Sequence, residues 1–175
     1  MLISLDFKVH ILFYNPNIAP HDEYLRRLDE LKRYCSEKDQ NLIVGGYDNE
    51  KWSAGIEPYK MLGERSERCR VCFRIRLDET FARARELGIG SVTTTLSVSP
   101  HKDAEMINSV GLELSSIYGI DFIRSDFKMN DGYKKSVEIS KEYGFYRQGY
   151  CGCIYSRTER ENKSGQGKKR DREPQ

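Results

Sequence analysis

The sequence lacks any long apolar run, and this absence excludes a membrane-spanning protein. No stretch approaches the roughly 20 apolar residues that a helix needs to cross a bilayer. Residues 1–6 also lack the basic segment and the small-residue cleavage site of a secretory signal. We therefore predict a soluble cytoplasmic protein without a membrane partner. In that compartment, paired cysteines are ligands or redox centres more often than structural disulfides.

The chain also lacks a large excess of charge. Its formal net charge is +2 over 175 residues, and residues 157–175 contain seven Lys or Arg against four Asp or Glu. The rest of the chain is therefore balanced. This length suits one domain with a single core, and no apolar residue follows Tyr155 to anchor the end of the chain. We predict one α/β domain over 1–156 and a disordered basic tail over 157–175.

Short apolar stretches alternate with segments of helical periodicity. Strands are predicted over 7–14, 42–46, 91–96 and 120–123, and helices over 21–38, 69–87, 99–118 and 132–143. Cys35 is expected in the core beside the apolar stripe of the first helix, and Ser99 is expected to cap the third. In the second helix the expected inward positions are Val71, Ile75, Phe81 and Leu87.

This alternation indicates βαβ units and a parallel sheet with flanking helices. The chain opens on a strand, with neither a preceding helix nor the glycine-rich or catalytic loop that usually follows the first strand of a nucleotide-binding α/β domain. We therefore expect a first βα unit to be missing upstream.

Four of the five cysteines form two tight pairs, Cys69 with Cys72 and Cys151 with Cys153. Each pair brings two sulfurs close together by chain geometry alone. The pairs predict a metal site, with zinc and an iron–sulfur cluster both open, or a redox disulfide. A disulfide across Gly152 would close a very small, strained and easily reduced ring. The plainer alternative is four thiols buried in a core.

Basic and aromatic residues flank both pairs. Helical spacing places Arg70 and Arg74 near one face, where they would lower thiol pKa values or contact phosphates. The alternative for them is a solvated helix face that is paired with carboxylates.

Before the second pair lie Tyr146, Arg147 and Tyr150, which are suited to stacking on bases or, alternatively, to packing. Lys102 ends a Ser-Pro-His-Lys segment that is expected to open a helix. The N-terminus of that helix would attract an anion or would simply be capped.

Several motifs together resemble one family, epoxyqueuosine reductase of the QueH type. The resemblance spans about residues 7–156 and rests on motifs in the right order and spacing. They are Phe-Tyr-Asn-Pro-Asn-Ile at 13–18, Arg-Cys-Arg-Val-Cys-Phe-Arg at 68–74, Thr-Thr-Leu at 94–96, Ser-Pro-His-Lys at 99–102 and Tyr-Arg-Gln-Gly-Tyr-Cys-Gly-Cys-Ile at 146–154.

The resemblance implies a Rossmann-like catalytic domain of the nucleotide α-hydrolase-like type. It implies two-electron removal of the epoxide oxygen from epoxyqueuosine in the tRNA anticodon loop, giving queuosine. It also implies a [4Fe-4S] cluster beside a further iron, and an electron donor. By this resemblance Cys69 and Cys72 would ligate the cluster, while Cys151 and Cys153 would form the redox-active pair. Substrate contacts would come from Arg70, Arg74, Lys102, Tyr146, Arg147 and Tyr150.

The chain departs from the family pattern at its start. The family begins with a strand and a loop that carries an adjacent Cys-Cys pair, and this chain has no counterpart. The resemblance therefore implies that two cluster ligands are missing. We expect a start site assigned too late, and the alternatives are a fragment or a degenerate copy without activity. For the chain by itself we expect poor cluster retention and little or no activity.

Two other functions remain open from the residues. In the first, all four paired cysteines hold one structural zinc in an RNA-binding module without redox activity. In the second, the chain is a metal-free thiol–disulfide oxidoreductase, although the Cys-x-x-Cys helix lacks a thioredoxin context.

Overall fold

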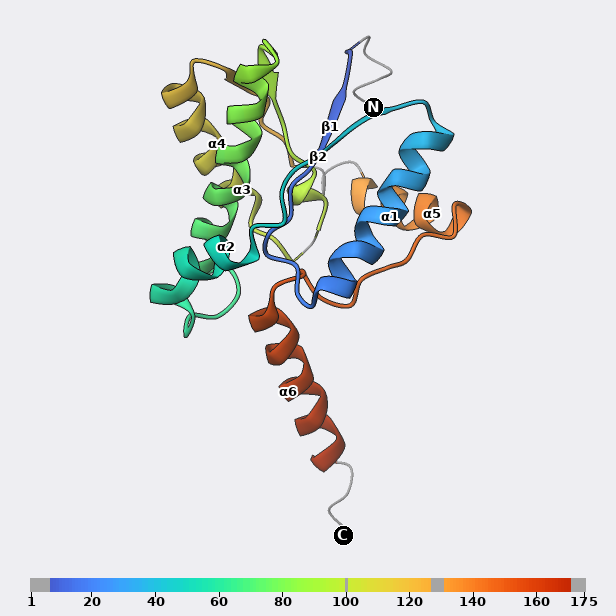
Figure 1. The fold of residues 1–175 in the computed structure, drawn as a ribbon. Coiled ribbons are helices and arrows are strands. Elements are labelled where there is room, and N and C mark those ends of the chain that lie inside the picture. The colour runs from blue at the N-terminus through green and yellow to red at the C-terminus, as the bar shows by residue number, and fades with distance from the viewer. Residues whose placement is uncertain (1–6, 100, 127–130, 171–175) are drawn as a thin grey trace.

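The structure is a computed structural model that describes residues 7–99, 101–126 and 131–170. Within these residues short strands alternate with helices, as predicted (Figure 1). The elements are β1 (His10–Phe13), α1 (His21–Glu37), β2 (Asn41–Val44), α2 (Asn49–Ile56), η2 (Glu57–Tyr59), α3 (Glu67–Glu86), β3 (Ser91–Val92), η3 (Leu96–Val98), α4 (Ala104–Tyr118), β4 (Asp121–Phe122), α5 (Gly132–Glu142) and α6 (Ile154–Arg170).

The strands form two parallel pairs. β1 pairs with β2, with His10 opposite Asn41, and β3 pairs with β4, with Val92 opposite Phe122. In each pair a helix, α1 or α4, connects the two strands, which is the crossover that parallel strands require. The prediction of βαβ units is confirmed. The chain is a mixed α/β protein whose described strands form two small parallel sheets instead of one continuous sheet.

The main core lies where α3 and α4 pack on β3 and β4. Phe81, Val110 and Leu114 are each at most 1% exposed there. Gly111 of α4 allows this packing, because a Cβ at that position would lie 2.4 Å from the ring of Phe122. Figure 1 shows α2, α3 and α4 on one side of β1 and β2, and α1 and α5 on the other.

A second core lies between α1 and the first sheet. Tyr24 and Leu28 pack with Phe13 and Ile18, and Cys35 is buried farther along the same helix. Burial raises the pKa of the Cys35 thiol. The prediction that Cys35 is a core residue is confirmed.

Three local predictions are wrong. Leu87, expected to face inward, is 52% exposed because it follows the last turn of α3. The strand predicted over 91–96 ends at Val92, and a short 3-10 helix follows. Ser99 does not cap α4; Asp103 does, by accepting a hydrogen bond at 3.0 Å from the Met106 N–H. The predicted first helical residue, Pro100, lies outside the described residues.

The segment predicted as a tail begins inside a helix. Residues 157–170 continue α6, which extends away from the rest of the chain (Figure 1), and residues 171–175 lie outside the described part. Glu159 of this helix pairs with the buried Arg68 at 2.7 Å, so its first turns are anchored to α3. The division into a domain over 1–156 and a tail stays a prediction. Among the described residues, no helix is long and apolar enough to cross a membrane.

Candidate redox site

The two cysteine pairs, distant in the sequence, lie in one region of the fold. Cys69 and Cys72 occupy the first turns of α3, and Cys151 and Cys153 form the turn before α6. Cys72, Cys151 and Cys153 pack in the same apolar cluster as Trp52. Cys69 packs in the neighbouring cluster, within electrostatic reach of Cys151. Folding therefore gathers four thiols from two remote segments.

The turn from Cys151 to Cys153 requires glycine at its centre. Gly152 has φ of 123°, a conformation that other residues rarely adopt, and a Cβ there would lie 2.9 Å from the side chain of Ile18. This conformation places the two sulfurs 3.6 Å apart. The pair is thus close to the geometry from which a disulfide forms.

The same turn is held by α1 and the loop before it. The Ala19 N–H donates to the Gly152 carbonyl at 2.9 Å, and the Tyr150 hydroxyl donates to the Ala19 carbonyl at 2.5 Å. Arg27 donates to the carbonyls of Cys151 and Tyr150, at 3.2 and 3.3 Å, and pairs with Glu23 at 2.8 Å. These bonds fix the position of the turn.

The pKa values of the two thiols of the turn are shifted in opposite directions. A hydrogen bond from the Cys153 thiol lowers the pKa of Cys151, and the positive charge of Lys102 acts in the same direction against the effect of burial. The same hydrogen bond, together with burial, raises the pKa of Cys153. The lowered pKa favours the thiolate form at Cys151, and the thiolate is the nucleophilic and electron-rich form of a cysteine.

Trp52 and Arg76 place buried N–H donors beside the Cys72 sulfur. Burial raises the pKa of Cys72, and the nearby Arg76 guanidinium and Trp52 indole oppose that effect. By hydrogen-bond geometry, neither Arg76 Nε nor Trp52 Nε1 has a partner among the described residues, and both atoms are buried. Arg76 donates through its other end to Asn15 Oδ1 at 2.5 Å. Buried donors without acceptors suit a site that receives negative charge.

The cations of the site are mutually repulsive. Loss of solvation and the neighbouring Arg76 lower the pKa of Lys102 to about 8, while the charges of Cys151 and Cys72 oppose this. Burial also lowers the pKa of Arg76, and Arg27 adds to the effect. The site thus combines thiols with three cationic side chains and attracts anions.

The described residues contain no group of three or more His, Cys, Asp or Glu side chains arranged to hold a metal ion. The thiols lie close together, but not at ligand geometry.

A family model described as "Epoxyqueuosine reductase QueH" matches residues 1–159. The chain belongs to this family. Curated proteins of the same name include those of Thermotoga maritima, 40% identical over 154 residues, and Streptococcus pyogenes, 39% identical over 154 residues. The Helicobacter pylori relative is 36% identical over 154 residues. The family resemblance is confirmed, and its name is that of an oxidoreductase.

These relatives differ in length from the chain. The matches cover 85–86% of this chain, but 80% of the Thermotoga maritima protein, 60% of the Streptococcus pyogenes protein and 42% of the Helicobacter pylori protein. The longer relatives therefore contain segments without a counterpart in the match.

The structure places the predicted substrate residues in different surroundings. Arg70 and Arg74 share one face, as predicted, but both pair with Glu113 of α4. This arrangement matches the alternative of a helix face that is paired with carboxylates. The hydrogen bond from Arg70 and the positive charges of both arginines lower the pKa of the Glu113 carboxyl. Lys102 acts electrostatically on Cys151 and Cys72, although the expected helix start at Ser99 is wrong.

The aromatic segment lies against α1 and α5. The Tyr146 hydroxyl donates to Glu23 at 3.1 Å, and the Arg26 guanidinium lies 3.4 Å from the centre of its ring. Arg147 donates to the Tyr133 hydroxyl at 3.4 Å. These contacts are those of packing residues at the rim of the site, and the predicted roles in substrate binding stay predictions.

Sequence reasoning missed Arg27, Trp52 and Arg76 as residues of the site. Arg76 follows Cys72 by four positions, one helical turn, and this spacing was the signal that could have identified it. Arg27 and Trp52 carry no such signal, because they reach the cysteines only through the tertiary fold.

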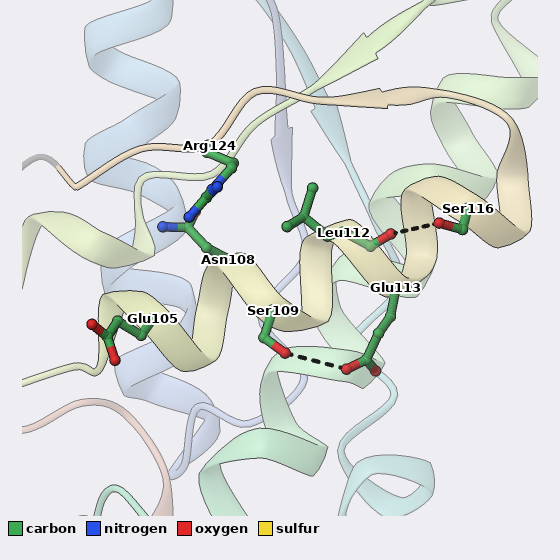
Figure 2. A pocket seen from close by; sticks show the side chains of 7 residues that line it. All are labelled: Glu105, Asn108, Ser109, Leu112, Glu113, Ser116 and Arg124. Carbon is green, nitrogen blue, oxygen red and sulfur yellow. Dashed lines mark hydrogen bonds between the residues drawn. The ribbon is translucent and has the colours of Figure 1, made fainter.

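A shallow groove on α4 is separate from the thiols (Figure 2). It is lined by Glu105, Asn108, Ser109, Leu112, Glu113, Ser116 and Arg124. Ser109 and Glu113 are joined within it by a hydrogen bond of 3.3 Å. The groove contains no cysteine, and we assign it no role.

Proposed function

We propose that the chain reduces epoxyqueuosine to queuosine in tRNA by two-electron removal of the epoxide oxygen. Family membership supports the reaction. The observation that carries the proposal for this chain is the convergence of Cys69 and Cys72 with the Cys151–Cys153 dithiol.

The dithiol matches the stoichiometry of the reaction. When two thiols become one disulfide they release two electrons and two protons. Removal of an epoxide oxygen as water, which leaves a carbon–carbon double bond, consumes two electrons and two protons. The thiolate character of Cys151 and the 3.6 Å distance between the sulfurs support this role. An external reductant would return the disulfide to the dithiol.

The family implies an iron–sulfur cofactor, and the types of donor in the site suit one. Sulfur donors suit iron, and the unpaired N–H groups of Trp52 and Arg76 beside Cys72 suit negative charge on sulfur. We propose that Cys69 and Cys72 hold the [4Fe-4S] cluster, with a further iron nearby. When bound, a cluster supplies single electrons at low potential.

The cationic residues suit an RNA substrate. Arg27, Arg76 and Lys102 present positive charge beside the thiols, as binding of a nucleotide phosphate requires. We propose that Tyr146, Arg147 and Tyr150 form the rim against which the anticodon loop rests, and that Arg70 and Arg74 become available when they release Glu113.

We also propose that the two strand pairs belong to one Rossmann-like sheet in a cytoplasmic protein. The parallel pairing with helical crossovers supports the fold.

The proposal is tested on the 175-residue chain, purified without oxygen and reconstituted with iron and sulfide. The chain is used in excess over epoxyqueuosine-containing tRNA, together with a low-potential chemical reductant, so that slow conversion is measurable. Nucleoside mass spectrometry detects the queuosine formed. In line with the low activity expected from the sequence, we expect slow conversion. Cys151→Ser should reduce it at least about 100-fold, while Cys35→Ser, a core variant, should retain it.

Iron analysis and tRNA binding accompany the assay. Iron-loaded chain that binds this tRNA but forms no queuosine contradicts the proposal. Tightly bound zinc without any redox signal indicates a zinc-stabilised RNA-binding module.

A further inference from the structure

Ser156 is a fully buried polar residue that contacts both halves of the dithiol turn. Its exposed fraction is 0%. Its hydroxyl accepts a hydrogen bond from the Cys151 N–H at 3.5 Å, and its own N–H donates to Cys153 Sγ at 3.4 Å. The hydroxyl also donates to Glu64 Oε1 at 2.5 Å. One side chain thus joins the two cysteines to a carboxylate from the segment before α3.

The start of α6 explains this arrangement. Cys153 immediately precedes the helix, and Ser156 is its third residue. At a helix N-terminus the preceding side chain commonly accepts the N–H of the third residue, while the third side chain reaches back toward the preceding backbone. Here Cys153 sulfur is the acceptor, and Ser156 reaches back to Cys151.

Glu64 determines which way the serine hydroxyl points. A hydroxyl has one hydrogen to donate and lone pairs to accept. Because the hydrogen is committed to Glu64, a lone pair is left for the Cys151 N–H. Glu64 itself is exposed, so its carboxylate is a charged acceptor that solvent reaches.

We propose that Ser156, oriented by Glu64, is a positioning residue that holds the Cys151–Cys153 turn in the conformation from which its disulfide forms and is reduced. This inference rests on the proposed function, in which that dithiol is the source of electrons. Ordering the turn keeps the two sulfurs close and so raises their effective concentration. Without the hydroxyl, the strained turn at Gly152 loses one of its restraints, and the disulfide becomes less favourable.

The test measures the Cys151–Cys153 couple in the full chain. Oxidised dithiothreitol takes two electrons and two protons from the thiols as one Sγ–Sγ bond forms, and it becomes the dithiol. The chain is equilibrated at several ratios of oxidised to reduced dithiothreitol. Differential alkylation with mass spectrometry then reports this pair separately from Cys35, Cys69 and Cys72.

Ser156→Ala is expected to lower the equilibrium constant for disulfide formation about tenfold, which corresponds to about 30 mV. Glu64→Gln keeps an acceptor oxygen and is expected to lower it only two- to threefold, whereas Glu64→Ala lowers it nearly as much as Ser156→Ala. The matched control is Glu161→Gln, on the same helix, which removes the charge that pairs with Arg157 at the surface. It should leave the couple unchanged.

Two results overturn the inference. One is an unchanged couple in Ser156→Ala, and the other is a shift in Glu161→Gln as large as that in Ser156→Ala. If Ser156→Ala does not fold, the surface variant Glu64→Ala decides in the same way. Queuosine formation is assayed in the same preparations. A shifted couple without queuosine from any variant counts against the proposed function alone, and queuosine with an unchanged couple counts against Ser156 alone.

Discussion

The α3–α4 core and the thiol site differ in the kind of atom that they bury. In the core, the side chains of Leu77, Phe81, Val110 and Leu114 contact other apolar groups and bring no polar atom with them. Such packing stabilises the fold through apolar burial, at about 25 cal/mol per Å² removed from water.

The thiol site instead leaves polar atoms unpaired. Within 7–99, 101–126 and 131–170, the buried side-chain N and O atoms without a hydrogen-bond partner are Asn17 Oδ1, Trp52 Nε1 and Arg76 Nε. All three adjoin the cysteines, because Asn17 lies against Gly152, Trp52 packs with Cys153 and Arg76 neighbours Cys72. Each unpaired buried group costs about 1–3 kcal/mol. The comparison teaches that the core supplies stability through apolar packing, while the site keeps buried polar atoms beside its thiols.

The largest effect is expected in the core. Phe81→Ala should lower the free energy of unfolding by about 3–5 kcal/mol, because it leaves a cavity between α3, α4 and the second sheet. Trp52→Phe removes part of a ring but also an unpaired N–H, so it should cost less than half as much. Urea denaturation measures both values, and equal losses would break the comparison between core and site.

A smaller effect separates the two kinds of cysteine. Iodoacetamide should modify Cys151 at a lower pH than Cys35, because the pKa of Cys151 is lowered and that of Cys35 is raised. The reaction of Cys151 is lost as the pH falls through its pKa, since the thiolate fraction disappears. Lys102→Met should raise that pKa and slow alkylation at pH 7 about two- to fivefold.

Rates for individual cysteines come from mass spectrometry of quenched samples. Lys60→Met is the control, because Lys60 pairs with Glu57 at the surface. A Lys102→Met rate equal to that of the Lys60 variant would show that Lys102 does not act on the thiolate.

The smallest effect concerns the cap of α4. Asp103→Ala should lower the free energy of unfolding by about 1 kcal/mol, because the Met106 N–H loses its acceptor. Ser99→Ala, at the position expected from the sequence, should change it by no more than about 0.5 kcal/mol. Thermal unfolding of the two variants decides between the caps, and a larger loss in Ser99→Ala would favour the sequence-based boundary.

Periodicity in the sequence identified the long helices well. The predicted 21–38, 69–87 and 132–143 differ from α1, α3 and α5 by at most two residues at either end. It misplaced the start of α4, because Ser99-Pro100 and Asp103 are both good N-terminal signals and local sequence does not rank them. It also missed the end of the strand at Val92, after which the structure contains a 3-10 helix.

Local sequence identified the residues that we propose carry the chemistry of this protein. The spacing of Cys69 with Cys72 and of Cys151 with Cys153 fixes two sulfurs near each other whatever the rest of the chain does, and the family motifs were legible without a structure. The fold alone decided that the two pairs meet, that Arg27 and Arg76 adjoin them, and that Ser156 connects their turn to Glu64. These contacts join residues up to 124 positions apart. Local sequence patterns do not predict contacts between residues so far apart in the chain. They depend on how helices and strands pack, and packing is a property of the whole chain.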